Sequence, residues 1–130
     1  MNRYIVIVST LLFLCWISKA NSHEMVPTYP VLEQSYQDGL LVTTLELFNK
    51  RKDVEYYEIA VFDNEFKPIP FVSSYSLFKL EYLGRVKFDV YIRAKDKDRA
   101  VYVCSRSKIR DQDKTLTSIT SMICSKFKRE

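Results

Sequence analysis

Glycine and histidine are both scarce in this chain of 130 residues, which has two glycines and one histidine. With so little glycine, the sequence has no Gly-rich loop that could cradle a phosphate, and a loop-rich disulfide scaffold is disfavoured. The single histidine, His23, makes no cluster of metal ligands and no nucleophile–base pair that the sequence supports. We therefore expect this protein to be no enzyme and to hold no cofactor or metal.

Cysteine is also rare, with three residues in the whole chain. Cys15 lies in an apolar N-terminal segment that we expect to be removed, which leaves Cys104 and Cys124 in the mature protein. Two cysteines in an exported chain indicate one disulfide, and two free buried thiols are the alternative. The bridge would close a loop of about 20 residues, for which loop entropy predicts about 3 kcal/mol of stability.

The first 20 residues have the pattern of an export signal. Arg3 supplies the positive charge, an apolar stretch of about 14 residues follows, and Ser18-Lys19-Ala20 fits a small-x-small cleavage site. A membrane span needs about 20 apolar residues, so we favour a cleaved signal over an uncleaved N-terminal anchor. Residues 21–130 then form a mature chain of single-domain size. We expect it in the periplasm, with secretion or surface association as alternatives.

The charges of both signs are mixed along the chain, with 20 basic and 16 acidic residues. Bases alternate with acids in residues 93–99, which is typical of a solvated turn and not of a nucleic-acid-binding stripe. Residues 126–129 are a basic cluster without close acids apart from Glu130. We interpret them as a solvated terminus in preference to a contact with an acidic partner or with lipid headgroups.

Alternating apolar residues indicate strands along the mature chain. The clearest run is residues 85–93, in which Val86, Phe88, Val90 and Ile92 share one face. The other expected strands or extended pieces are residues 31–36, 41–47, 57–61, 68–71, 76–80, 100–104 and 118–128. About seven short strands without an amphipathic helix predict an all-β, immunoglobulin-like β-sandwich.

Residues 118–128 are predicted to be the final strand. Ile119, Ile123 and Phe127 share one parity, as expected of an apolar strand face. A bond from Cys124 to Cys104 would pin the last two strands together. An ordinary sheet edge, with this apolar face in the core, explains the pattern as well as a strand that binds a partner does.

Several motifs occur in a characteristic order between residues 41 and 128. They are a strand ending at Asn49, a Pro-containing segment at residues 68–71, Gly84 before an alternating strand, Arg93 at the end of that strand, and a final strand with Lys126. In this order the chain resembles the N-terminal immunoglobulin-like domain of periplasmic pilus-assembly (fimbrial) chaperones. Some members of that family carry a disulfide between the last two strands, and Cys104 and Cys124 fit that arrangement.

The resemblance implies a chaperone-like protein-binding module that pairs an edge strand with a pilin or other exported subunit. In such pairing the backbone ladder provides affinity and alternate side chains provide fit. The candidate partner-binding side chains are Ile119, Met122, Ile123 and Phe127, and the sequence leaves open which parity faces outward. Lys126 is the candidate anchor for a terminal carboxylate of the partner, through a charge-assisted contact.

Two departures from the family affect these expectations. Residues 31–36 contain no Arg or Lys that could form a basic pair with Lys126, and the sequence provides one domain where the family has two. A structural or accessory subunit of a secretion, conjugation or pilus apparatus is therefore an alternative, and a secreted inhibitor or adhesion module is another. We expect a protein partner, with no nucleic acid and no stable membrane insertion after cleavage.

Overall fold

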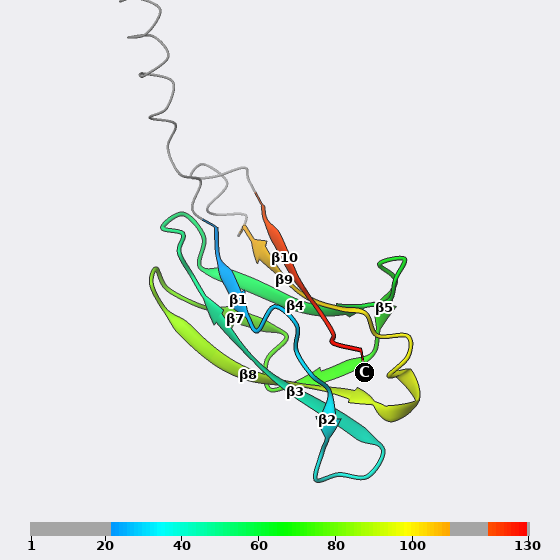
Figure 1. The fold of residues 1–130 in the computed structure, drawn as a ribbon. Coiled ribbons are helices and arrows are strands. Elements are labelled where there is room, and N and C mark those ends of the chain that lie inside the picture. Colours follow the sequence, from blue (N-terminus) through cyan, green and yellow to red (C-terminus); the bar gives the residue numbers. More distant parts are fainter. Residues whose placement is uncertain (1–21, 110–119, 130) are drawn as a thin grey trace, which may run out of the picture.

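The computed structural model describes residues 22–109 and 120–129. The predicted export signal and Ile119 lie outside these residues. Within them, two antiparallel sheets pack face to face (Figure 1). The strands are β1 Glu24–Val26, β2 Glu33–Gln34, β3 Leu40–Phe48, β4 Tyr56–Phe62, β5 Pro68–Ile69, β6 Phe71–Ser73, β7 Leu77–Lys79, β8 Arg85–Arg93, β9 Tyr102–Lys108 and β10 Met122–Lys126, and a 3-10 helix, η1, covers Ala94–Asp96.

The strand order confirms the predicted immunoglobulin-like sandwich. The first sheet has the order β1-β3-β8-β6, and β2 also pairs with β3. The second sheet has the order β10-β9-β4-β5, and β7 also pairs with β4. These orders match the two sheets of an immunoglobulin fold. The described residues form more strand segments than the seven expected, because the edge strands are divided into short pieces.

The long strands bury the faces that the sequence indicated. Burial alternates along β3, β4 and β8, and Leu45, Ile59 and Val90 are each at most 2% exposed. The core lies between the two inner faces, where alternate side chains of both sheets meet. Its buried members are Met25, Leu45, Leu47, Val54, Tyr57, Ile59, Val61, Ile69, Phe78, Leu80, Phe88, Val90, Ile92, Ala100, Val103 and Phe127.

The short strands differ from the prediction in extent and partner. The strand expected at residues 31–36 is reduced to Glu33–Gln34, and β1 was not predicted at all. The segment at residues 68–71 is divided at Pro70, because β5 joins the second sheet and β6 joins the first. β9 begins later than the strand expected at residues 100–104 and continues to Lys108.

Candidate partner-binding site

β10 lies at one edge of the second sheet. One side of its backbone is hydrogen-bonded to β9, and its other side is the outer edge of the sheet. The Phe127 N–H donates to the Val101 carbonyl at 2.9 Å, and the Ser107 N–H donates to the Ser121 carbonyl at 2.8 Å. Backbone groups alternate in direction along an antiparallel ladder. The odd-numbered residues of this stretch therefore bond to β9, and the even-numbered residues direct their backbone N–H and C=O groups to the outer edge.

The side chains of β10 also divide by parity. Ser125 is 1% exposed and Phe127 is 3% exposed, and Ile123 packs against the core. Met122, at 44% exposed, and Lys126 face outward. The predicted apolar face of the final strand is thus part of the core. Of the predicted partner contacts in the described residues, only Met122 and Lys126 are open to solvent.

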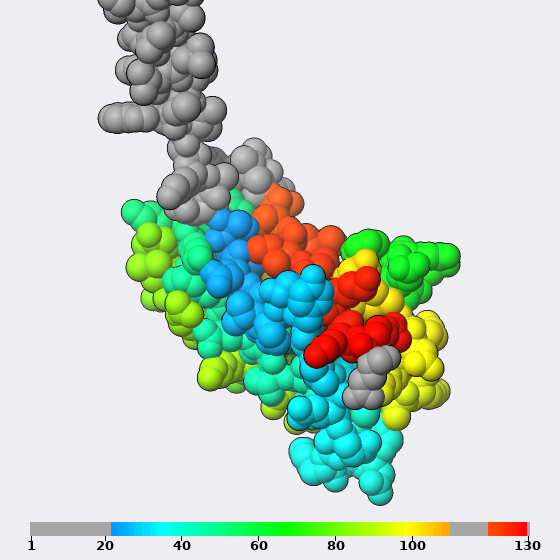
Figure 2. Space-filling view, in the orientation of Figure 1, coloured from blue at the N-terminus to red at the C-terminus, as the bar shows by residue number. Residues whose placement is uncertain are grey.

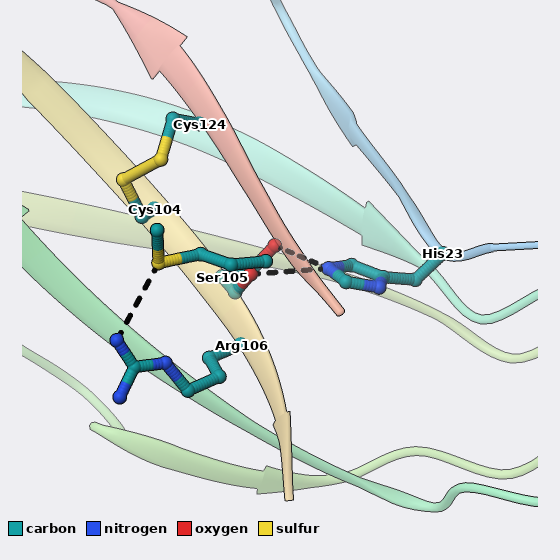
Figure 3. The surroundings of a disulfide bond; sticks show 6 residues. His23, Cys104, Ser105, Arg106 and Cys124 are labelled. Carbon is teal, nitrogen blue, oxygen red and sulfur yellow. Dashed lines mark hydrogen bonds between the residues drawn. A yellow bond between two sulfur atoms is a disulfide. The ribbon is translucent and has the colours of Figure 1, made fainter. Parts of the chain in front are cut away.

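The predicted disulfide is present and lies on the outer face of the second sheet. Cys104 and Cys124 are direct register partners, and their sulfur atoms are bonded at 2.05 Å. Figure 3 shows Cys104 and its neighbour Ser105 on opposite sides of β9, with Ser105 directed to the interior. Arg106 lies on the same outer face and donates to the Met122 sulfur at 3.6 Å. The bond therefore ties the edge strand to β9 without occupying space in the core.

The N-terminal segment covers part of the outer edge of β10. The Lys126 N–H donates to the Thr28 carbonyl at 3.1 Å, and the Lys128 N–H donates to the Pro30 carbonyl at 2.9 Å. Figure 2 shows this segment, in blue, lying directly against β10, in orange and red. Among residues 22–109 and 120–129, no strand pairs with the outward backbone groups of Met122 and Cys124. Among the described residues, the unpaired part of the edge is therefore the beginning of β10, where β1 lies beside it but pairs with β3.

The C-terminal basic cluster is partly used within the domain. The Arg129 guanidinium donates to the Asp98 carbonyl at 2.9 Å and to the Ala100 carbonyl at 3.2 Å, next to η1. The Lys126 side chain is exposed and stands beside Tyr102 on the outer face of the sheet. Arg129 is thereby held by the fold, whereas no described side chain forms an ion pair with Lys126.

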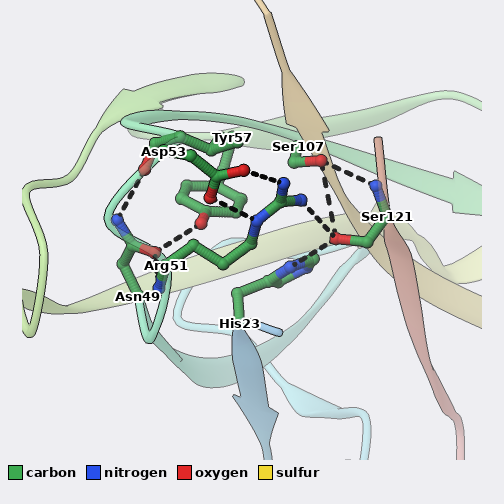
Figure 4. Close-up of polar contacts among 8 residues, drawn as sticks. His23, Asn49, Arg51, Asp53, Tyr57, Ser107 and Ser121 are labelled. Carbon is green, nitrogen blue, oxygen red and sulfur yellow. Dashed lines mark hydrogen bonds and ion pairs between the residues drawn. The ribbon is translucent and has the colours of Figure 1, made fainter. Parts of the chain in front are cut away.

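A buried polar cluster lies behind the unpaired part of the edge, at the end of the sandwich where β10 begins (Figure 4). Its members are His23, Asn49, Arg51, Tyr57, Ser105, Ser107 and Ser121. His23 Nε2 lies 2.8 Å from Ser105 Oγ and 3.2 Å from the Ser105 carbonyl oxygen, while Nδ1 lies 3.2 Å from Ser121 Oγ. His23 thus joins the N-terminal segment to both β9 and the start of β10.

Asn49, Arg51 and Tyr57 bring the β3–β4 turn and the start of β4 into the cluster. The Tyr57 hydroxyl donates to Asn49 Oδ1 at 2.5 Å, and Asn49 Nδ2 donates to the Val54 and Leu80 carbonyls at 2.8 Å each. Arg51 forms a two-bond ion pair with Asp53, and its Nη1 lies 3.5 Å from Ser121 Oγ. These bonds satisfy polar groups that would otherwise be buried at a cost.

Burial and charge set the protonation of this cluster. Burial lowers the pKa of His23 below its ordinary value, and the nearby Arg51 cation adds to the effect, while the bond to the Ser105 backbone opposes it. Burial raises the pKa of Tyr57 to about 12. The hydrogen bond to Asp53 raises the pKa of Arg51. At neutral pH, His23 is therefore neutral, Tyr57 is protonated, and Arg51 carries the positive charge of the cluster.

The sequence interpretation missed this cluster. His23 stands in a stretch without periodicity, next to the predicted cleavage site, and was assigned no role. In the sequence, the cluster was indicated only by the inward serines of β9. Ser105 and Ser107 have the same parity as the inward-facing Val103. Small polar residues on an inward face leave room for larger polar groups from elsewhere.

Within the described ranges, no group of three or more histidine, cysteine or acidic residues could hold a metal ion. None of the helical segments described is long and apolar enough to cross a membrane.

Comparison with known proteins gives a likeness in structure. The domain superposes on the E. coli chaperone DraB with a TM-score of 0.61 and 17% identity, over 82% of this chain and 53% of that chain. The chain has the immunoglobulin-like fold of this chaperone. It spans about half of DraB's length. A FixG-related protein from Vibrio parahaemolyticus gives a TM-score of 0.46 and 15% identity, over 83% of this chain and 96% of that chain. No family model and no curated protein matches the sequence.

Proposed function

We propose that this protein is an exported, non-catalytic binding module that pairs the edge of β10 with an extended segment of a pilin-like or other exported subunit. The observation that carries the proposal is the outer edge at Met122 and Cys124, to which no described strand bonds, on a strand that a disulfide holds in place. An extended segment added there would continue the second sheet beyond β10.

The chemistry of the edge suits this mode of binding. The outward N–H and C=O groups provide hydrogen bonds that do not depend on the partner's sequence, and Met122 provides a flexible apolar contact. Lys126 lies two outward positions further along the strand and can pair with a carboxylate of the partner. The fold shared with the chaperone DraB supports the same role, and the proposal of a pilin-like partner extends that likeness from fold to function.

A photo-reactive amino acid at position 122 tests the proposal in cells that export the protein. We expect one small exported subunit to be cross-linked through position 122. The matched control is position 72 on β6, because Val72 is also exposed, at 65%, and lies at the edge of the first sheet. Equal cross-linking from both positions would contradict a specific β10 edge. Co-purification with many envelope-assembly components would instead favour a structural subunit.

Met122→Pro tests whether the partner uses the backbone. The substitution removes an outward N–H that makes no bond to β9, and proline is tolerated at such edge positions. We expect unchanged folding and at least about tenfold weaker binding, from the lost bond and the obstructed edge. Met122→Ala keeps the N–H and should bind more tightly than the proline variant. Equal affinities of the two variants would refute pairing through the backbone.

A further inference from the structure

The N-terminal segment closes the second half of the β10 edge. The Lys126 and Lys128 N–H groups are bonded to the carbonyls of Thr28 and Pro30. This segment is held on both sides of these bonds, because Met25 is 4% exposed in the core and the Pro30 side chain is fully buried. A partner segment paired with the start of β10 therefore cannot continue along the edge to the end of the strand.

Such a segment can leave the edge over the outer face of the second sheet. β1 belongs to the first sheet and lies beside β10. On the outer face of the second sheet, by contrast, the side chains of Met122, Arg106 and Lys126 are exposed. A segment paired near Cys124 therefore meets this face where it departs from β10.

The outward side chains at that point form rows across the strands. The disulfide and Ala60 make up one row. The next row toward the β4–β5 turn consists of Lys126, Tyr102 and Phe62. From the edge of the sheet inward, this second row passes from a cation to two aromatic rings.

Phe66 adds a third ring to this row from the β4–β5 turn, which projects from the sandwich beside β5 (Figure 1). Its ring is stacked on that of Tyr102, with the centroids 4.9 Å apart and the planes 6° from parallel. The centroid of Phe62 lies 5.9 Å from that of Phe66. Phe66 is nevertheless 50% exposed. Phe62, Phe66 and Tyr102 thus form an aromatic platform with a flat apolar surface in contact with solvent.

The backbone at Phe66 does not favour a bulky side chain. Its φ is +59°, in the left-handed region that glycine and asparagine adopt most readily. The turn is closed by other groups, because the Asp63 N–H donates to the Lys67 carbonyl at 2.9 Å and Asp63 Oδ1 accepts from the N–H groups of Glu65 and Lys67. None of these bonds needs a ring at position 66. Backbone conformations of this kind cluster at sites that bind ligands.

We propose that the aromatic platform binds an aromatic or proline side chain of the partner segment, just beyond the part that pairs with β10. This inference rests on the proposed function, to which it adds a second contact and a sequence requirement. From a segment paired at Cys124, the platform lies about 10 Å across the strands and about 7 Å along them. An extended chain covers that path in about three or four residues.

The chemistry around the platform favours a peptide with a ring and a carboxylate. Aromatic rings stack on one another at centroid distances of about 4.5–7 Å, and proline-containing segments dock on aromatic surfaces. Lys126, at the edge of the same row, can pair with a carboxylate next to the bound ring. A sugar would need polar partners for its hydroxyl groups. The nearest carboxylates are engaged within the turn, since Asp63 accepts backbone bonds and Glu65 pairs with Lys67.

A photo-reactive amino acid at position 66, in cells that export the protein, tests the proposal. We expect it to capture the same exported subunit as position 122. The matched control is position 83, because Leu83 also has a positive φ, of +63°, and is 57% exposed. Leu83 is bonded to Asn49, before β4, whereas Phe66 follows β4. No capture at position 66, a different protein captured there, or equal capture at positions 66 and 83 would overturn the proposal.

The edge variant Met122→Pro tests whether the platform binds a continuation of the edge-paired segment. Because one segment would use both surfaces, Met122→Pro should reduce capture at position 66 by about the same factor as it reduces binding. Met122→Ala should retain most of the capture. Capture at position 66 that is unaffected by Met122→Pro would show a separate binding event and would refute the continuation.

Phe66→Asn separates a binding role of the ring from a structural one. Asparagine suits the left-handed backbone, so the midpoint of urea unfolding should stay the same or rise. The affinity for the subunit captured through position 122 should fall by about tenfold. Leu83→Asn makes the same change in the other turn and should bind like the wild type. A Phe66→Asn protein that loses stability but binds like the wild type would show that the ring serves the fold alone.

Capture at the two positions also separates this proposal from the edge pairing. Capture at position 122 without capture at position 66 would overturn the platform and leave the edge pairing intact. Absence of capture at both positions would count against the edge pairing itself, and the platform would fall with it.

Discussion

Removal of the Cys104–Cys124 disulfide measures how strongly β10 is held in the fold. β10 is a five-residue strand with one strand neighbour, β9, and the N-terminal segment on its other side. The disulfide is the covalent part of this attachment. The perturbation is the double substitution Cys104→Ala with Cys124→Ala, which opens the loop without adding a polar group where Cys104 is 1% exposed.

The expected loss follows from the length of the closed loop. The two cysteines are 20 residues apart. For a loop of about that length, the chain-entropy model gives about 11 cal/mol/K, or about 3 kcal/mol at 25 °C. In a domain of this size that loss lowers the melting temperature by about 12–24 °C. The bond lies on the outer face, so little of the loss should come from a cavity in the core.

Urea denaturation of the oxidised wild type, the reduced wild type and the double-alanine variant provides the assay. Relative to the oxidised wild type, the free energy of unfolding should be about 3 kcal/mol lower in the reduced wild type and in the double-alanine variant. These two losses should agree closely. A Cys104→Ser with Cys124→Ser variant should be less stable than the alanine pair, because it buries a hydroxyl at position 104. A loss below about 1 kcal/mol in all three would refute the reasoning from loop entropy.

Three other substitutions or conditions test separate parts of the structure by the same denaturation assay. Burial lowers the pKa of folded His23 below the ordinary value of 6.5, so its contribution to stability is complete above that pH and is lost as the pH falls toward the folded pKa. His23→Gln should flatten this dependence, and an unchanged slope would assign it to another group. Tyr57→Phe removes the donor to Asn49 Oδ1 and should cost about 1–2 kcal/mol, whereas an unchanged stability would show that this bond contributes nothing net. Gly84→Ala should cost about 1–3 kcal/mol, because the new Cβ would lie 2.9 Å from the Glu81 carbonyl oxygen, and a neutral effect would mean that the turn relaxes freely.

The sequence was sufficient for the parts of the fold in which burial alternates over many residues. β3, β4 and β8 each present one buried and one wetter face, so the period of two is visible without any knowledge of their neighbours. The disulfide was also predictable, because the two cysteines that follow the predicted export signal have one pairing.

The short elements could not be predicted, because they are too short to show this alternation. β1 has three residues and β2 has two, which is too few to show a period, and their positions depend on β3. The outward parity of β10 was undetermined because Met122 and Ile123 are both apolar neighbours, and only the packing of the core selects between them. The role of His23 depends on Ser105 and Ser121, which are far from it in the chain. The residues next to His23 in the sequence therefore do not indicate that role.

The position of the disulfide also protects β10 against slipping along β9. Cys124 can reach Cys104 when the two residues face each other on the outer side of the sheet, as they do here. A shift by one residue would place Ser105 opposite Cys124 and would turn every side chain of the final strand to the wrong face. The same shift would also take Ile123 and Phe127 out of the core and turn Lys126 inward, so core packing favours the alignment that the disulfide holds. Oxidation therefore makes the alignment that packing favours a covalent one, and β10 keeps one fixed phase relative to β9.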